Sequence, residues 1–309
     1  MDKKSTTILV VDDEPEILSM VTDFLTDVEG YSVLNARNGK EALDSVLPHN
    51  KVDLILSDIN MPIMKGFELL ARVRKEYPTI KRVLITAYNV EDYIELALKH
   101  DVGNIFVKST PFNFTELSAL LENLLSGDIF GVKRYFNEIS GEQSMLIKRG
   151  DEIDKDAERI ISFLPQRAYR KKLNLVLIEL LTNAVFYGIR KEKPEEKEGW
   201  VYEFDLSDED AINVSVMYDD KKYAISVRDK GGRLKKMDVL YWLHRQVARD
   251  ESGIPLGVFD THGRGFFIAR KYIDRLIINI HEGKQTEVII LNYYDPVFQG
   301  SKPIHINEI

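Results

Sequence analysis

The sequence predicts two folds in succession: a doubly wound α/β fold with a five-stranded parallel sheet, and then an α+β two-layer sandwich. The chain has 309 residues, which is long for one ordinary domain. Its first part alternates short apolar segments with helical patterns, whereas its second part combines long helices with a hairpin pattern. We therefore predict a first domain over residues 1–125, a linker over 126–144 and a second domain over 145–309.

The first domain contains five β-α units in regular order. The segment "LILS" at 54–57 illustrates its strands, because an apolar run of this length is typical of a strand buried on both faces of a parallel sheet. Right-handed crossovers then place helices on both faces of the sheet. The predicted strands are 7–11, 32–36, 53–57, 82–86 and 104–108, and the predicted helices are 15–28, 39–47, 66–76, 91–99 and 113–125.

The second domain mixes helices with antiparallel strands. The segment 211–229 alternates around a turn and predicts a hairpin, while 171–188 predicts a long, buried helix. The linker carries several apolar residues between 129 and 136, too many for a free tether, so we expect it to dock on one of the domains. The other predicted elements are strands 145–149, 276–281 and 286–293 and helices 151–164, 237–249 and 265–275.

Composition excludes several classes of function. The chain has no cysteine, which rules out disulfides, thiolate metal sites and cysteine nucleophiles. A net charge of −8 argues against a broad nucleic-acid surface. Its apolar runs are shorter than the roughly 20 residues that a membrane-spanning helix needs, and the N-terminus does not resemble a signal peptide. We expect a cytoplasmic, bacterial protein whose partners include neither nucleic acid nor membrane.

Polar side chains gather where the predicted strands of the first domain end. Asp12 and Asp13 follow the first strand, Asp58 the third, Thr86 the fourth and Lys108 the fifth. Ligands of open parallel sheets bind outside these carboxyl ends. Three carboxylates at one edge repel each other unless a hard cation such as Mg²⁺ lies among them. We predict that Asp58 is a nucleophile that accepts a phosphoryl group, with Mg²⁺ and Lys108 offsetting its charge.

Four motifs carry a family resemblance. In order, "VVDDEP", "LILSDINMPIMKG", "LITAY" and "IFVK" make residues 1–125 resemble a response-regulator receiver domain. This resemblance implies that Asp58 is phosphorylated. It also implies that Asp12 and Asp13 bind Mg²⁺ together with Asp58 and the main-chain carbonyl of Asn60.

The same resemblance assigns a conformational switch. Thr86 and Phe106 would form the switch pair, and Lys108 would contact the phosphoryl group. One departure is "KSTP", in which Pro111 lies two residues beyond the position next to the lysine where the family usually has it.

A second group of polar residues lies in the long apolar helix of the second domain. Glu179 and Asn183 are spaced i, i+4 and therefore share one face of that helix. Burying a carboxylate and an amide without partners costs several kcal/mol. A bound metal and ligand would remove this cost, and so would hydrogen bonds within the domain.

Glycines lie at the end of a predicted strand and at the start of a predicted helix. Asp229 ends a strand and precedes Gly231, where the absence of a side chain lets the backbone approach a ligand. Gly263 and Gly265 begin a helix, and helix N-termini bind phosphate readily. The order Glu-x-x-x-Asn, Asp-x-Gly and Gly-x-Gly is more specific than any of these motifs alone.

With "ELLTNAV", "VRDKGG" and "GRGFFIARKYID", the region 145–293 resembles the GHKL (Bergerat) ATP-binding fold, and most of all anti-sigma-factor serine kinases. Arg233 replaces the second glycine of one box, and Tyr187 replaces a common histidine. The resemblance implies Mg-ATP as ligand, Asn183 as Mg²⁺ ligand, Glu179 as general base, Asp229 as partner of the adenine amino group, Thr286 near the adenine, Gly231, Gly263 and Gly265 lining the nucleotide, and 233–262 as the lid.

These expectations combine into a two-component response regulator. An upstream histidine kinase or phosphotransfer protein would phosphorylate Asp58 and thereby control a Ser/Thr protein kinase whose substrate resembles an anti-sigma antagonist. Two alternatives stay open: ATP could organise a partner-binding surface without phosphoryl transfer, or the second domain could donate phosphate to a separate histidine-bearing protein. The sequence leaves open the substrate, the sign of regulation and whether the chain forms a homodimer.

Overall fold

The computed structural model describes residues 3–168, 172–193, 196, 199–257, 260, 263–295 and 300–309. The chain forms two compact units, and each is described by itself. The first unit comprises Met1–Ile129 and Pro303–His305, and the second comprises Phe130–Lys302 and Ile306–Ile309. Among the described helices, none is long and apolar enough to span a membrane.

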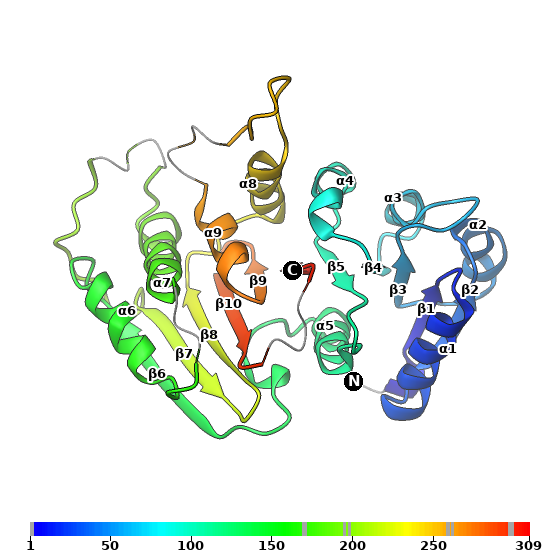
Figure 1. Cartoon of the computed structure of the whole chain (residues 1–309), viewed down its shortest axis with the longest axis horizontal. Coiled ribbons are helices and arrows are strands. Elements are labelled where there is room, and N and C mark those ends of the chain that lie inside the picture. The colour runs from blue at the N-terminus through cyan, green and yellow to red at the C-terminus, as the bar shows by residue number, and fades with distance from the viewer. Residues whose placement is uncertain are drawn as a thin grey trace. The chain divides into compact units, whose positions relative to one another are not determined.

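The first unit is built on a parallel sheet with the strand order β2-β1-β3-β4-β5 (Figure 1). This arrangement confirms the predicted doubly wound α/β fold. Its strands are β1 (Thr7–Val11), β2 (Ser32–Ala36), β3 (Leu54–Asp58), β4 (Lys81–Thr86) and β5 (Asn104–Val107). Its helices are η1 (Lys3–Ser5), α1 (Pro15–Asp23) with η2 (Phe24–Val28), α2 (Gly39–Glu41) with η3 (Ala42–Val46) and η4 (Leu47–His49), α3 (Gly66–Glu76), η5 (Val90–Tyr93) with α4 (Ile94–His100), and α5 (Phe114–Ser126).

The core of the first unit explains why its strands are so apolar. Every residue of β3 is buried, as expected for a central strand with helices on both faces. Helix α1 begins with Pro15, a residue suited to a first helical turn, and Asn113 caps α5 by accepting a hydrogen bond from the Glu116 amide. The Thr110–Pro111 peptide bond, at the displaced proline, is cis.

The first unit also contains a strand segment that the sequence analysis missed. The strand β11 (Ile304–Glu308) begins with two residues that pair with β5 in antiparallel register, Ile304 opposite Ile105 and His305 opposite Asn104. The predicted boundary placed this segment in the second domain. The prediction followed chain order, whereas in the structure Pro303–His305 packs on a strand about 200 residues earlier in the sequence.

The second unit is built on an antiparallel sheet with the order β6-β7-β8-β10-β9 (Figure 1). Helix α7 packs against α6 and α9, and η7 contacts β8. Helices and antiparallel strands are thus combined as the sequence predicts. The strands are β6 (Gly141–Ile147), β7 (Ile212–Tyr218), β8 (Lys222–Asp229), β9 (Arg275–His281) and β10 (Gln285–Tyr293), and the helices are η6 (Lys133–Tyr135), α6 (Ile153–Ser162), α7 (Leu173–Thr182), η7 (Asn183–Ile189), α8 (Lys236–Val247) and α9 (Gly265–Tyr272).

The predicted linker is packed rather than free. Val132, Tyr135 and Phe136 are buried, and the backbone amide of Gly131 donates a hydrogen bond to Glu287 at 2.8 Å. The linker is also shorter than predicted, because β6 already begins at Gly141. Most side chains of β6 are exposed, so its first residues lack the apolar alternation by which a strand is recognised.

Candidate functional site

The strand ends of the first unit bring together the side chains that the sequence singles out. Asp12 and Asp13 follow β1 directly, Asp58 and Thr86 are the last residues of β3 and β4, and Lys108 follows β5. Because the strands are parallel, all these ends lie at one edge of the sheet.

Lys108 is the centre of this cluster. Its ammonium lies 2.6 Å from Asp58 Oδ1, 2.8 Å from Asp12 Oδ2 and 3.3 Å from Glu14 Oε1, and its side chain is only 5% exposed. Burial lowers the pKa of Lys108, but the hydrogen bonds to the two aspartates outweigh burial and raise this pKa to about 12. Lys108 therefore stays positively charged and offsets the negative charge of the two buried carboxylates, Asp12 and Asp58.

Asp58 is held from several sides. Its Oδ2 accepts a hydrogen bond from the Asn60 amide at 2.6 Å, and the Asn60 side chain donates to the Tyr93 hydroxyl at 2.6 Å. Gly66 packs against the Asp58 carbonyl so closely that a Cβ atom there would lie 2.1 Å from this oxygen. Tyr93 and Gly66 had no assigned role in the sequence analysis, although Gly66 ends one of the quoted motifs.

Thr86 lies beside Lys108, whose backbone amide donates a hydrogen bond of 2.8 Å to the Thr86 carbonyl. Thr86 is buried, and its Oγ1 accepts a hydrogen bond from the Tyr88 amide at 3.0 Å. Phe106 is buried with its ring centroid 5.4 Å from that of Phe112. Asp13 is exposed.

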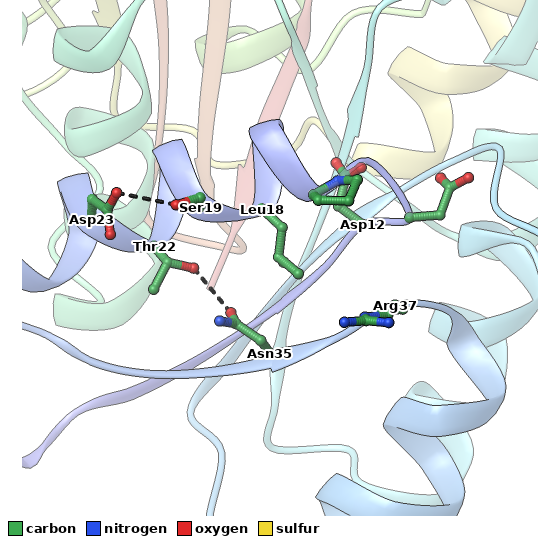
Figure 2. A pocket seen from close by; sticks show the side chains of 9 residues that line it. Asp12, Leu18, Ser19, Thr22, Asp23, Asn35 and Arg37 are labelled. Carbon is green, nitrogen blue, oxygen red and sulfur yellow. Dashed lines mark hydrogen bonds between the residues drawn. The ribbon is translucent and has the colours of Figure 1, made fainter.

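A pocket of about 340 Å³ adjoins the acids, between α1 and β2 (Figure 2). Figure 2 shows the hydrogen bond of 3.0 Å that Thr22 Oγ1 donates to Asn35 Oδ1, which links the helix to the strand. Most of the residues that line this pocket have polar side chains, so no apolar pattern in the sequence indicates the pocket. The lining residues are Asp12, Asp13, Pro15, Leu18, Ser19, Thr22, Asp23, Asn35 and Arg37.

The donor set of the acid cluster is compatible with Mg²⁺. Among the described residues, no group of three or more Asp, Glu or His side chains is placed to hold a metal ion. Asp12 and Asp58, however, both reach the same ammonium, so their oxygens lie close together. Mg²⁺ commonly uses one or two carboxylates and fills its other positions with water and phosphate oxygens.

In the second unit, α9 lies against the predicted polar pair. A Cβ atom on Gly265 would lie 3.1 Å from Asn183 Nδ2 and 3.2 Å from Glu179 Oε2. Helix α7 changes to the π-helical η7 at Asn183, a distortion often found at functional sites. The first amides of α9 have no intrahelical partner and suit an anion.

Asp229 and its neighbours form another cluster beside η7. Asp229 is 6% exposed, and its Oδ1 accepts hydrogen bonds from the amides of Gly231 at 2.8 Å and Gly232 at 3.4 Å. Burial raises the pKa of Asp229 to about 6, against the lowering effect of these amides. Thr286 lies opposite Asp229 in the β8–β10 register, and a Cβ atom on Gly231 would lie 2.1 Å from the Gly188 carbonyl oxygen.

Gly263 contacts a residue that the sequence analysis did not single out. It has φ = 79°, and a Cβ atom there would lie 2.2 Å from the Trp242 ring. Trp242 belongs to α8, in the predicted lid 233–262. Residues 258, 259, 261 and 262 of that lid lie outside the described residues.

Comparisons with known proteins concern the first unit. The family model of the response regulator receiver domain matches residues 8–122. A chemotaxis protein CheY homolog of Campylobacter jejuni is 34% identical over 120 residues, which cover 38% of this chain and 91% of the relative. The probable transcriptional regulator ycf29 of Pyropia yezoensis is 28% identical over 139 residues, which cover 45% of this chain.

One solved structure, response regulator protein TrrA of Thermotoga maritima in complex with Mg²⁺ and BeF, is 38% identical and has a TM-score of 0.35. Its match covers 39% of this chain and 99% of that one. The match to ycf29 spans only 61% of that relative's length. The family model and the match to the CheY homolog show that residues 8–122 are a response regulator receiver domain and that the chain belongs to the response-regulator family.

Proposed function

We propose that an upstream histidine kinase or phosphotransfer protein phosphorylates this response regulator on Asp58. We further propose that its second unit is a GHKL-type protein kinase that binds Mg-ATP and is controlled by that phosphorylation. The observation that carries the first part is the position of Lys108, whose ammonium contacts both Asp58 and Asp12.

At the receiver, an Asp58 oxygen attacks phosphorus, and the bond from phosphorus to the donor nitrogen breaks as the imidazole leaves with a proton. The product adds a phosphoryl group with a charge of about −1.5 to −2. The ammonium of Lys108 is in position to neutralise part of this negative charge. Mg²⁺ held by Asp12 and Asp58 would neutralise more of it. The neighbouring pocket offers a route by which the donor reaches the acids.

The proposed kinase function of the second unit is supported by the contact of α9 with Asn183 and Glu179. In our proposal the α9 amides bind the phosphates, Asn183 contributes to the Mg²⁺ site, and Glu179 acts as general base for transfer to Ser or Thr. Asp229 then accepts a hydrogen bond from the adenine amino group, with Thr286 beside it. The acceptor protein would resemble an anti-sigma antagonist.

The receiver assignment is tested with a small phosphodonor and Mg²⁺, followed by mass spectrometry of the modified residue. Wild type should gain one phosphoryl group on Asp58, and Asp58→Asn should gain none. Asp44→Asn, at an exposed aspartate of the same unit, serves as the control and should behave as wild type. Unchanged phosphorylation of Asp58→Asn would refute the assignment.

The second-unit assignment is tested by calorimetry with Mg-ATP and by labelled ATP with candidate partners from the same operon. Asn183→Ala should abolish metal-dependent binding, and Asp229→Asn should weaken binding. Glu179→Ala should bind but not transfer. Undiminished affinity in both binding variants would rule out the GHKL assignment, whereas binding without transfer in wild type would favour a partner-binding switch.

A further inference from the structure

A basic segment lies at the amino ends of the strands in the first unit, opposite the edge that carries the acid cluster. The segment 72–82 joins the end of α3 to the start of β4, and it contains five basic residues and one acidic residue. The whole chain, by contrast, has a net charge of −8. A local charge of this sign raises the concentration of anions at the surface beside it. The basic residues are Arg72, Arg74, Lys75, Lys81 and Arg82.

Arg82 has a partly buried guanidinium. It is the second residue of β4 and lies opposite Ile55 in the register with β3. Its Nη1 atom is buried and donates no hydrogen bond to any residue that the structure describes. The residue as a whole is only partly buried, so its side chain remains open to solvent. A guanidinium is always charged, and burying a charge without a hydrogen-bond partner is costly.

Asp101 compensates the charge of Arg82 only in part. The Asp101 carboxylate pairs with a second guanidinium, that of Arg74 on α3, at 2.9 Å, and the Arg74 side chain is 53% exposed. Burial lowers the pKa of Arg82, the negative charge of Asp101 raises this pKa, and the positive charge of Arg74 lowers it again. Two guanidiniums and one carboxylate leave one positive charge (2 − 1) at this place.

We propose that Arg74 and Arg82 form a binding site for a phosphate group, either of the free ion or of a small phosphorylated molecule. Arginine presents its N–H groups as a planar fork that matches the oxygens of phosphate. One negative charge of the ligand would compensate the excess charge of the two guanidiniums, and the neighbouring basic residues would offset its second charge. The site lies at the start of β4, whereas Asp58 lies at the end of β3, so it does not depend on the proposed phosphorylation.

A structural role of Arg82 and a binding role predict opposite effects on stability. Removing a group that holds the fold together lowers the free energy of unfolding, whereas removing a buried charge that lacks a partner does not. Arg82→Met keeps a long, straight side chain and leaves Asp101 paired with Arg74. In chloride buffer without phosphate, Arg82→Met should therefore be at least as stable as wild type in urea unfolding. A lower unfolding midpoint would show that Arg82 supports the fold and would count against the binding site.

Binding is measured by nuclear magnetic resonance on the full chain with isotope-labelled arginine. Inorganic phosphate replaces chloride at constant ionic strength, and the guanidinium signals of Arg74 and Arg82 should shift to saturation. In Arg82→Met the Arg74 signal still reports binding, and the phosphate concentration at half-saturation should rise at least about tenfold. Arg82→Lys keeps the charge but loses the fork, so it should weaken binding as well.

Arg72→Met is the matched control, because it removes the same charge from an exposed position two residues before Arg74, on a different face of α3. This variant should bind phosphate as wild type does. Equal weakening in Arg72→Met and Arg82→Met would show a general charge effect and overturn the site, and so would the absence of a saturable shift in wild type.

Glycerol phosphate serves as a second probe that distinguishes the two sources of the phosphate group. Tighter binding of glycerol phosphate than of inorganic phosphate would support the site and assign it to a phosphorylated small molecule. Tighter binding of inorganic phosphate would support the site and assign it to the free ion. If neither probe shifts the signals of Arg74 and Arg82, the proposal is wrong.

Discussion

The carboxylate of Glu287 on β10, which is fully buried, lies 2.7 Å from the guanidinium of Arg228, its register partner on β8. Three further donors reach Glu287: Ser226 Oγ at 2.6 Å, the Asn279 side-chain amide at 3.0 Å and the Gly131 backbone amide at 2.8 Å. A buried carboxylate is costly unless it is paired and hydrogen-bonded, and here both conditions are met. The network ties the segment after the receiver to the sheet of the second unit.

Removing this carboxylate should destabilise the second unit. Glu287→Ala leaves four donors without their acceptor, and breaking a buried pair of this kind costs about 3–5 kcal/mol. Glu282→Ala is the control, because Glu282 lies on the surface with a side chain 66% exposed and pairs with the exposed Lys235. In denaturant unfolding, the free energy of unfolding should fall strongly in Glu287→Ala and should not change measurably in Glu282→Ala. Equal unfolding midpoints for the two variants would contradict the role given to the network.

Lys108→Met should weaken beryllium fluoride binding to the receiver. A hydrogen bond to a charged group is worth about 1.5–3 kcal/mol, which corresponds to a loss in affinity of roughly 10- to 150-fold. Lys40→Met removes an exposed lysine that pairs with Asp44 and should leave the affinity unchanged. Calorimetry at fixed Mg²⁺ compares the two variants, and similar affinities would argue that Lys108 does not contact the phosphoryl group.

The buried carboxyl of Asp229 predicts a pH dependence of stability. Its pKa is raised to about 6 in the folded protein, above the value of about 3.9 in an unfolded chain. The folded state therefore binds the proton more tightly, so this contribution to stability is fully present below about pH 4 and is lost as the pH rises through 6.

Without nucleotide, the free energy of unfolding of the second unit should include a loss of about 1–3 kcal/mol between pH 4 and 7 from this residue. Asp229→Asn keeps an oxygen for the Gly231 amide but cannot titrate, so its stability should decline less over the same range. Urea unfolding at several pH values compares the two proteins. Identical pH profiles would show that Asp229 does not titrate as inferred.

Gly265→Ala should impair ATP binding while leaving the fold intact. The new methyl group would lie 3.1 Å from Asn183 Nδ2 and 3.2 Å from Glu179 Oε2, so both side chains must shift slightly. We expect Mg-ATP affinity to fall about tenfold, with little change in the unfolding midpoint. In Gly199→Ala the methyl group meets open space, so that variant should bind as wild type. Equal affinities would place the nucleotide elsewhere.

The receiver could be predicted in detail because the sequence patterns that define its strands and its site each lie within a few consecutive residues. Parallel strands buried on both faces give short apolar runs, and each run ends at a residue whose position at the sheet edge follows from topology alone. Asp12, Asp58 and Lys108 meet in the structure for this reason. In the second unit, Gly265 reaches Asn183 across 82 positions of sequence (265 − 183), and only the family resemblance brought them together in advance.

Contacts between polar residues far apart in the sequence could not be predicted. The segment "IHIN" at 304–307 alternates as a strand does, but its polar residues are buried as well. His305 contacts Glu116, which is 189 residues away in the sequence, and Glu287 accepts a hydrogen bond from Gly131, which is 156 residues away. No sequence periodicity indicates such pairs. From the sequence alone, each of these polar side chains is expected at the surface, because its partner is not known.

The discontinuity of the first unit has a consequence for biosynthesis. Ribosomes add residues in chain order, and N-terminal domains generally fold first. The five parallel strands are therefore available for folding well before Pro303 has been translated. During that interval the outer edge of β5 faces the crowded environment of the nascent chain without its antiparallel neighbour, and neighbouring chains on the same messenger RNA could pair with it. Elongation rate, rather than final stability, would then set how often the receiver assembles with its own last strand.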